Sequence, residues 1–97
     1  MKYSKDEILN DIYACIEAIN LTLPENVRMP LEKNSLLVDT DSIFDSLSTI
    51  NFFVSLEELY LSKGLSIQLL DEDLLIEEGG PYKSINTLSE FILNKIN

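Results

Sequence analysis

The sequence has no histidine and no tryptophan, and it has a single cysteine among its 97 residues. Without histidine it can form neither a Ser-His-Asp triad nor a Cys-His pair, and a zinc site built from histidines or several cysteines is excluded. Its three glycines do not form the glycine-rich loop that cradles phosphates. We therefore expect a protein that is not an enzyme, has no catalytic residue of its own and holds no metal ion.

Basic residues are also scarce. The sequence has 7 Lys and Arg but 17 Asp and Glu, which gives a net charge of −10. Such a chain repels nucleic-acid phosphates and anionic membranes, and it attracts basic protein surfaces. One cysteine suits a reducing compartment. The first residues lack a signal-like apolar run, and no stretch approaches the ~20 apolar residues of a membrane span. We expect a cytoplasmic monomer with no nucleic-acid partner and no stable membrane insertion.

The same charge imbalance predicts a stability that depends on salt. With a net charge of −10 on 11.0 kDa, like charges repel one another in the compact state. Raising the ionic strength to 0.15 M shortens the Debye length to ~8 Å. We therefore expect thermal denaturation to show a higher melting temperature at 0.15 M salt than at low salt. A melting temperature that does not change over this range would contradict the prediction.

The length fits one domain over residues 1–97, and the spacing of apolar residues is typical of helices. Ser4 and Glu7 have capping-box spacing, which predicts a first helix from Lys5 to about Asn20. Cys15 lies on the apolar face of this helix, where we expect it to pack in the core. The prolines at 24 and 30 then predict a long loop over 22–44.

Asp45 is a suitable N-cap for a second helix over 46–62, with Gly64 just beyond its end. A short third helix is expected over 71–78, preceded by a short extended piece over 65–69. A fourth helix is expected over 87–96, with Thr87 as the N-cap of another capping box. Together these elements predict an all-α fold, a small four-helix bundle with a long loop between helices 1 and 2.

The predicted second helix has apolar residues on two sides. Its core arc consists of Phe52, Phe53, Leu56, Leu59 and Tyr60. A second apolar edge consists of Leu47, Ile50, Val54 and Leu61. Either this second edge is exposed beside Ser46 as a docking surface, or the loop over 22–44 covers it. The sequence pattern leaves both arrangements open.

The tripeptide Asp45-Ser46-Leu47 places a serine at the expected start of the second helix. The first backbone N–H groups of a helix have no partner within it, and the helix dipole is positive there. A phosphate ester on the Ser46 hydroxyl would be stabilised by both. Taken alone, the tripeptide is more typical of an ordinary capped helix start.

The run Asp45-Ser46-Leu47-Ser48-Thr49-Ile50, followed without a gap by Leu56-Glu57-Glu58, resembles the acyl carrier proteins. That family has Asp-Ser-Leu at the head of helix 2 and Leu-Glu-Glu late in it. The resemblance implies a bundle of acyl-carrier type with 4′-phosphopantetheine attached to Ser46 and with Asp45 and Leu47 beside it. The thiol of this arm would hold acyl intermediates as thioesters, for fatty-acid, polyketide or related acyl transfer.

The resemblance also implies partners: a phosphopantetheinyl transferase, and acyl-loading and acyl-processing enzymes with basic docking patches. Ten acidic residues against one lysine between residues 39 and 78 suit such patches. The implied docking residues are Leu47, Ile50, Asn51, Val54, Glu57 and Glu58. The implied acyl-chain lining consists of Phe52, Phe53 and Leu56, which we also expect to lie in the core.

The chain departs from the family pattern in places. Ser48 and Asn51 stand where further acids are usual, and Ile43 stands where glycine is common. The stretch over 60–86 is longer than in the family and amphipathic, so it would flank an acyl chain or dock a dedicated partner. Two alternatives therefore stay open: a D-alanyl carrier protein of similar architecture, and an unmodified acidic helical adaptor that binds a basic protein.

Overall fold

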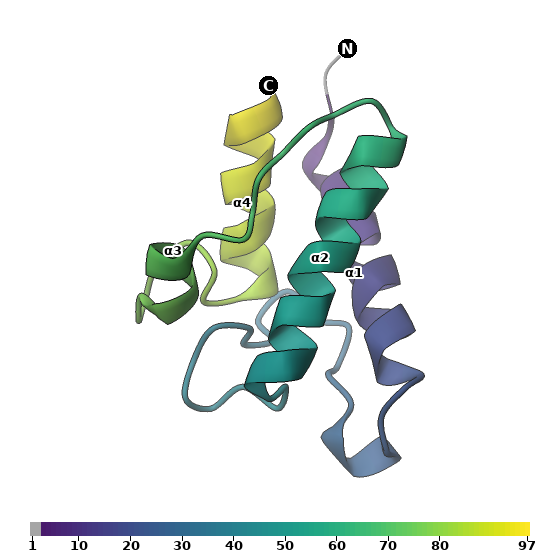
Figure 1. Cartoon of the computed structure of the whole chain (residues 1–97), viewed down its shortest axis with the longest axis vertical. Coiled ribbons are helices and arrows are strands. Elements are labelled where there is room, and N and C mark those ends of the chain that lie inside the picture. The colour runs from purple at the N-terminus through teal and green to yellow at the C-terminus, as the bar shows by residue number, and fades with distance from the viewer. Residues whose placement is uncertain (1–2) are drawn as a thin grey trace.

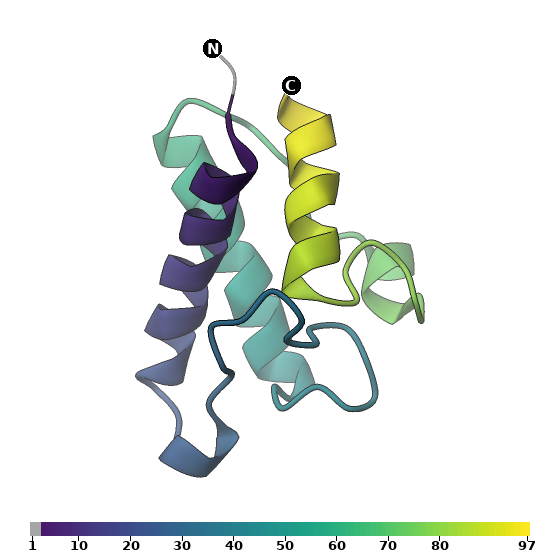
Figure 2. The ribbon, with the colours of Figure 1, turned by 180° about the vertical axis from the view of Figure 1, so that it is seen from behind.

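The computed structural model describes residues 3–97, and in this part of the chain the regular structure is helical. The elements are α1 (Lys5–Asn20), a 3-10 turn (Glu25–Val27), α2 (Ser46–Ser62), α3 (Glu72–Ile76) and α4 (Ile85–Ile96). α1 packs against both α2 and α4. Figures 1 and 2 show these three helices as the body of the molecule and α3 at its side. The expected all-α bundle with a long loop between its first two helices is confirmed.

The first two helices begin at the predicted residues because the predicted caps form. The Ser4 hydroxyl accepts the N–H of Glu7, and the Glu7 carboxylate accepts the N–H of Ser4. At α2, the Asp45 carboxylate accepts the N–H of Ser48 at 2.7 Å. Each contact satisfies an N–H group that a helix start leaves without a partner.

α2 ends in a Schellman motif built around Gly64. Gly64 has a φ of +83°, a left-handed conformation that glycine adopts without a steric penalty. Its N–H donates to the carbonyl of Leu61, and the N–H of Leu65 donates to the carbonyl of Tyr60. These two bonds satisfy carbonyls that the helix end leaves free and direct the chain away from α2.

The other two helices differ from the sequence prediction. α3 covers Glu72–Ile76 rather than 71–78, because Asp71 is its N-cap and accepts the N–H groups of Asp73 and Leu74. α4 begins at Ile85 rather than 87, because Ser84 and Thr87 form the capping box and Thr87 is its third helical residue. Residues 65–69 join α2 to α3 without forming a strand.

The core lies between the inner faces of α1, α2 and α4, and the predicted core arc of α2 is part of it. Phe53 is fully buried, with its ring stacked on Tyr82 at 4.6 Å and edge-on to Phe52 at 5.1 Å. Such aromatic pairs add to the free energy gained by burying their surface. The largest fully buried side chains are Tyr60, Tyr82, Phe52, Phe53, Ile8, Ile12, Ile16, Leu37, Leu56, Leu69, Ile85 and Leu88.

The long loop is fixed to the bundle at two places. The Asn20 amide donates to the carbonyl of Met29 and accepts its N–H, so the first half of the loop returns to the end of α1. Further on, the N–H groups of Leu37 and Val38 donate to the carbonyls of Lys83 and Tyr82. This second contact holds residues 37 and 38 beside the chain that enters α4, which positions one wall of the site described below.

The two ends of the described chain lie side by side. The N–H of Tyr3 donates to the Asn97 side-chain oxygen at 3.1 Å, and the Asn97 amide donates to the carbonyl of Tyr3 at 2.9 Å. Figure 1 shows this end of the molecule at the top and the first turn of α2 at the bottom. The start of α2 is therefore at the opposite pole from residues 3 and 97.

Candidate functional site

The candidate site is centred on Ser46, the first residue of α2. Ser46 and its neighbours Asp45 and Leu47 are all exposed, and the expected start of the second helix at Ser46 is confirmed. The N–H groups of Ser46 and Leu47 lie before the first intrahelical hydrogen bond of α2. With the dipole of a 17-residue helix behind them, they favour an anionic group at this point.

Asp45 supports this helix start electrostatically. Its carboxylate accepts the N–H of Ser48, and this hydrogen bond holds the pKa of Asp45 below the ordinary value of 3.8. Because the carboxylate form makes the stronger cap, the stabilisation is present above the unfolded-state pKa and is lost as the pH falls through the folded-state pKa.

We expect Asp45→Ala to lower the melting temperature at neutral pH, because the cap of α2 is removed, and Asp45→Asn to lower it less, because asparagine also caps helices well. The two melting temperatures are compared with that of the wild-type protein by circular dichroism at pH 7 and at about pH 2.5. As the pH falls towards and through the lowered folded-state pKa of Asp45, the carboxylate takes up a proton, so the gap between the wild type and Asp45→Asn should shrink. An unchanged melting temperature for Asp45→Ala would show that this cap does not stabilise the fold.

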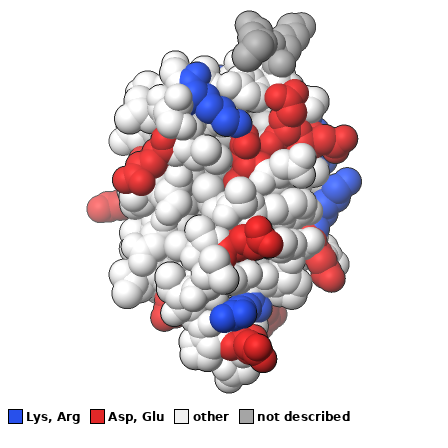
Figure 3. Space-filling model, turned by 90° about the vertical axis from the view of Figure 1, so that its right-hand side faces the viewer, with Lys and Arg blue, Asp and Glu red and all other residues white. Residues whose placement is uncertain are grey.

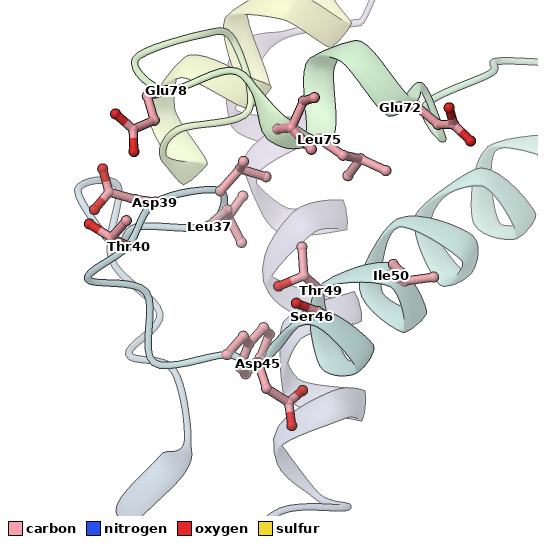
Figure 4. A pocket seen from close by; sticks show the side chains of 13 residues that line it. Leu37, Asp39, Thr40, Asp45, Ser46, Thr49, Ile50, Glu72, Leu75 and Glu78 are labelled. Atoms are coloured by element: carbon pink, nitrogen blue, oxygen red, sulfur yellow. The ribbon is translucent and has the colours of Figure 1, made fainter.

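Beside Ser46 lies a cavity of about 580 Å³, within the range of ordinary small-molecule sites. Three parts of the chain enclose it: the loop residues 37–40, the first turns of α2 and the segment that carries α3. Figure 4 shows Ser46 and Thr49 together at one side, with Leu37 and Leu75 facing the same space from the loop and from α3. The residues that line it are Leu37, Val38, Asp39, Thr40, Phe44, Asp45, Ser46, Thr49, Ile50, Glu72, Leu75, Ile76 and Glu78.

The cavity combines an apolar interior with an acidic rim. Phe44 and Leu37 are buried, and Leu75 and Val38 are half-buried against the core. The carboxylates at its edge come from Asp39, Asp45, Glu72 and Glu78. An apolar chain starting near Ser46 could enter it, whereas a free anion would meet carboxylates at the entrance.

The second apolar edge of α2 is exposed, which decides between the two arrangements that the sequence left open. Leu47 and Leu61 are 66% and 63% exposed, Ile50 is also exposed, and Val54 is half-buried. The long loop therefore does not cover this edge. Figure 3 shows the side of the molecule on which α1 lies in Figure 1, where acidic side chains and fewer basic ones are set among wide uncharged areas. Exposed apolar side chains in a row are typical of a surface that contacts a partner.

The remaining expected docking residues fall into two groups. Asn51 and Glu58 are exposed on α2 beside this edge. Glu57 is half-buried, and its carboxylate accepts the N–H groups of Leu69 and Leu70 at 2.5 and 2.7 Å. Glu57 thus binds the backbone of the segment that follows α2, a structural contact that its position among acidic residues did not indicate.

The expected acyl-lining residues and the observed cavity do not coincide. Phe52, Phe53 and Leu56 are fully buried in the core, as predicted, but none of them lines the cavity beside Ser46. Contact between them and a bound chain would require the core to part, and it stays a prediction. The sequence pattern did not indicate Leu37, Phe44 and Thr49 as lining residues, whereas Leu75 and Ile76 belong to the amphipathic stretch over 60–86 that was expected to flank an acyl chain or to dock a partner.

Cys15 lies away from the site, buried on α1 as predicted. Burial, together with the nearby Asp11 carboxylate, raises the pKa of its thiol to about 11. A thiol with so high a pKa is almost entirely protonated at neutral pH and is a poor nucleophile. Thioester chemistry at this protein would therefore need a thiol from another molecule.

Other kinds of site receive no support from the described residues. Over 3–97, His, Cys, Asp and Glu side chains form no group of three or more suited to a metal ion. Within the same span, the helices lack the length and apolar character needed to cross a bilayer. No family model, curated protein or solved structure matches the chain.

Proposed function

We propose that this protein is a carrier that holds acyl groups as thioesters on a 4′-phosphopantetheine arm attached to Ser46. The observation that carries the proposal is the placement of Ser46: an exposed hydroxyl on the first residue of α2, at the mouth of a mostly apolar cavity. The resemblance of residues 45–50 and 56–58 to the acyl carrier proteins points to the same serine.

The attachment reaction suits the start of α2. The Ser46 oxygen attacks the phosphorus of coenzyme A that bears the pantetheine, a new phosphodiester bond forms, and adenosine 3′,5′-bisphosphate leaves. The hydroxyl proton passes to a base of the phosphopantetheinyl transferase, since this chain has no histidine. The resulting phosphodiester carries one negative charge, which the free N–H groups and dipole of α2 stabilise.

A carrier needs little chemistry of its own. The protein supplies a fixed attachment point, and the thiol at the end of the arm forms the thioester in place of the buried Cys15. The cavity of about 580 Å³ next to Ser46 is a place where an apolar acyl group would be shielded from water. Nothing in this role calls for catalysis by the chain itself.

The surface suits brief contacts with several enzymes. The exposed edge of Leu47, Ile50, Val54 and Leu61 offers apolar contact beside the arm, and Asn51 and Glu58 border it. The net charge of −10 steers the protein towards partners with basic patches and raises association rates without requiring high affinity. We expect a phosphopantetheinyl transferase and acyl-loading and acyl-processing enzymes to dock here.

Intact mass spectrometry tests the proposal. The purified protein is incubated with coenzyme A and a phosphopantetheinyl transferase of broad specificity, and we expect a mass gain of one phosphopantetheine group. The exposed apolar edge of α2 would also serve an unmodified acidic adaptor for a basic protein, so the absence of any gain would overturn the carrier proposal in favour of the adaptor.

A further inference from the structure

The segment over 70–81, which carries α3, forms one wall of the cavity but is weakly held by its own packing. α3 has five residues and none of them is buried, and Ile76 is 78% exposed. Leu74 and Leu75 are only half-buried against the core. Segments with few buried contacts open locally at a low free-energy cost compared with unfolding of the whole domain.

The two ends of this segment are held much more firmly than its middle. Leu69 and Tyr82, which flank it, are both fully buried. The Tyr82 hydroxyl donates to the carbonyl of Leu69 at 2.6 Å, so one hydrogen bond joins the chain before the segment to the chain after it. On the other side, Glu57 of α2 accepts the N–H groups of Leu69 and Leu70.

These three hydrogen bonds meet at one point of the backbone. They link α2, the start of the α3 segment and its end, and we refer to them as the Leu69 latch. Two of them have an ionised acceptor, which makes them stronger than hydrogen bonds between neutral groups. The latch is also the place where the segment is tied directly to α2, the helix that forms the opposite wall of the cavity.

We propose that residues 70–81 are a flap over the cavity, and that the Leu69 latch, through Glu57 and Tyr82, holds this flap closed against α2. With the latch made, Leu75 and Ile76 stay at the cavity wall opposite Ile50 and Thr49. With the latch broken, the flap moves away from α2 by turning about its two ends, while α1, α2 and α4 keep their packing. Gly79, with a φ of +73°, lies at one of these ends, where the chain turns back towards Tyr82. Glu57 and Tyr82 are thus positioning residues for the cavity.

Hydrogen exchange of the unmodified protein tests the flap without any step that depends on Ser46. We expect amides in 70–78 to exchange at least about tenfold faster in Glu57→Ala and in Tyr82→Phe, because each variant removes part of the latch. Amides of α1 and α4 should keep their wild-type rates. Glu57→Gln retains a carbonyl oxygen that can accept both N–H groups, so it should restore most of the protection.

Glu58→Ala is the matched control, since Glu58 is the neighbouring acid on α2 and is exposed. Equal acceleration in all helices, or no acceleration in 70–78, would overturn the proposal. If Glu57→Ala does not fold, Tyr82→Phe alone decides, because it keeps the buried ring and removes only the hydroxyl.

Binding of Nile red, a neutral apolar dye, tests whether the flap covers the cavity. We expect its fluorescence to rise with Glu57→Ala and Tyr82→Phe and to stay at the wild-type level with Glu58→Ala, because an open flap exposes the apolar interior of the cavity. Faster exchange in 70–78 without increased dye binding would show that the segment does not cover the cavity, and would overturn that part of the proposal. Both measurements use the unmodified protein, so they still test the flap if phosphopantetheine does not attach to Ser46.

Discussion

Ser46→Ala is expected to abolish the mass gain completely when the protein is incubated with coenzyme A and a phosphopantetheinyl transferase. The substitution removes the oxygen that we propose attacks phosphorus, and it leaves no other hydroxyl at the first residue of α2. Ser46 is exposed, and alanine is a good residue within a helix, so the fold should be preserved. The free energy of unfolding should stay within about 0.5 kcal/mol of the wild-type value.

Ser66→Ala is the control for this result. Ser66 is also exposed, but it lies in the chain between α2 and α3 and not at a helix start. It should take up one phosphopantetheine as the wild type does. Undiminished modification of Ser46→Ala would show that the arm is attached to another hydroxyl, and the role proposed for the head of α2 would then be wrong.

Phe53→Ala is expected to have the largest effect on stability, with a loss of about 3–5 kcal/mol in the free energy of unfolding. Phe53 is fully buried, and its replacement leaves a cavity between Phe52 and Tyr82, whose rings lie 5.1 and 4.6 Å from it. Since domains of this kind are stable by about 5–15 kcal/mol, the variant should be close to unfolding at ambient temperature. Urea denaturation followed by circular dichroism measures the loss.

Leu61→Ala is a suitable control, because Leu61 is an apolar residue on the same helix but is 63% exposed. We expect its free energy of unfolding to change by no more than about 0.5 kcal/mol. A loss below about 1 kcal/mol for Phe53→Ala would contradict the packing described for the core between α1, α2 and α4.

The caps explain which parts of the fold were predictable from local sequence. Ser4 with Glu7, Asp45, and Gly64 each act on backbone groups within a few residues, so the pattern alone located α1 and both ends of α2. The start of α4 was missed because two capping patterns overlap there, one beginning at Ser84 and one at Thr87. The earlier one prevails, and it places Ile85 fully buried in the core.

The cavity and the latch depend on contacts between distant residues, which local patterns do not specify. Glu57, the middle residue of the Leu-Glu-Glu run, looked like a surface acid, but its carboxylate accepts the N–H groups of residues 12 and 13 positions further along the chain. Leu37 reaches the site because its N–H bonds to the carbonyl of Lys83. Ser46, by contrast, was predictable, since its position depends only on where α2 begins.

The paired hydrogen bonds between Tyr3 and Asn97 have a practical consequence for handling the molecule. Because residues 3 and 97 lie at the pole away from Ser46, a fusion partner or a solid support attached at residue 97 would leave Ser46 facing outward. The same proximity would let a short peptide join residue 3 to residue 97 without stretching any helix. An immobilised array of the protein would then present every Ser46 to the solution in one orientation.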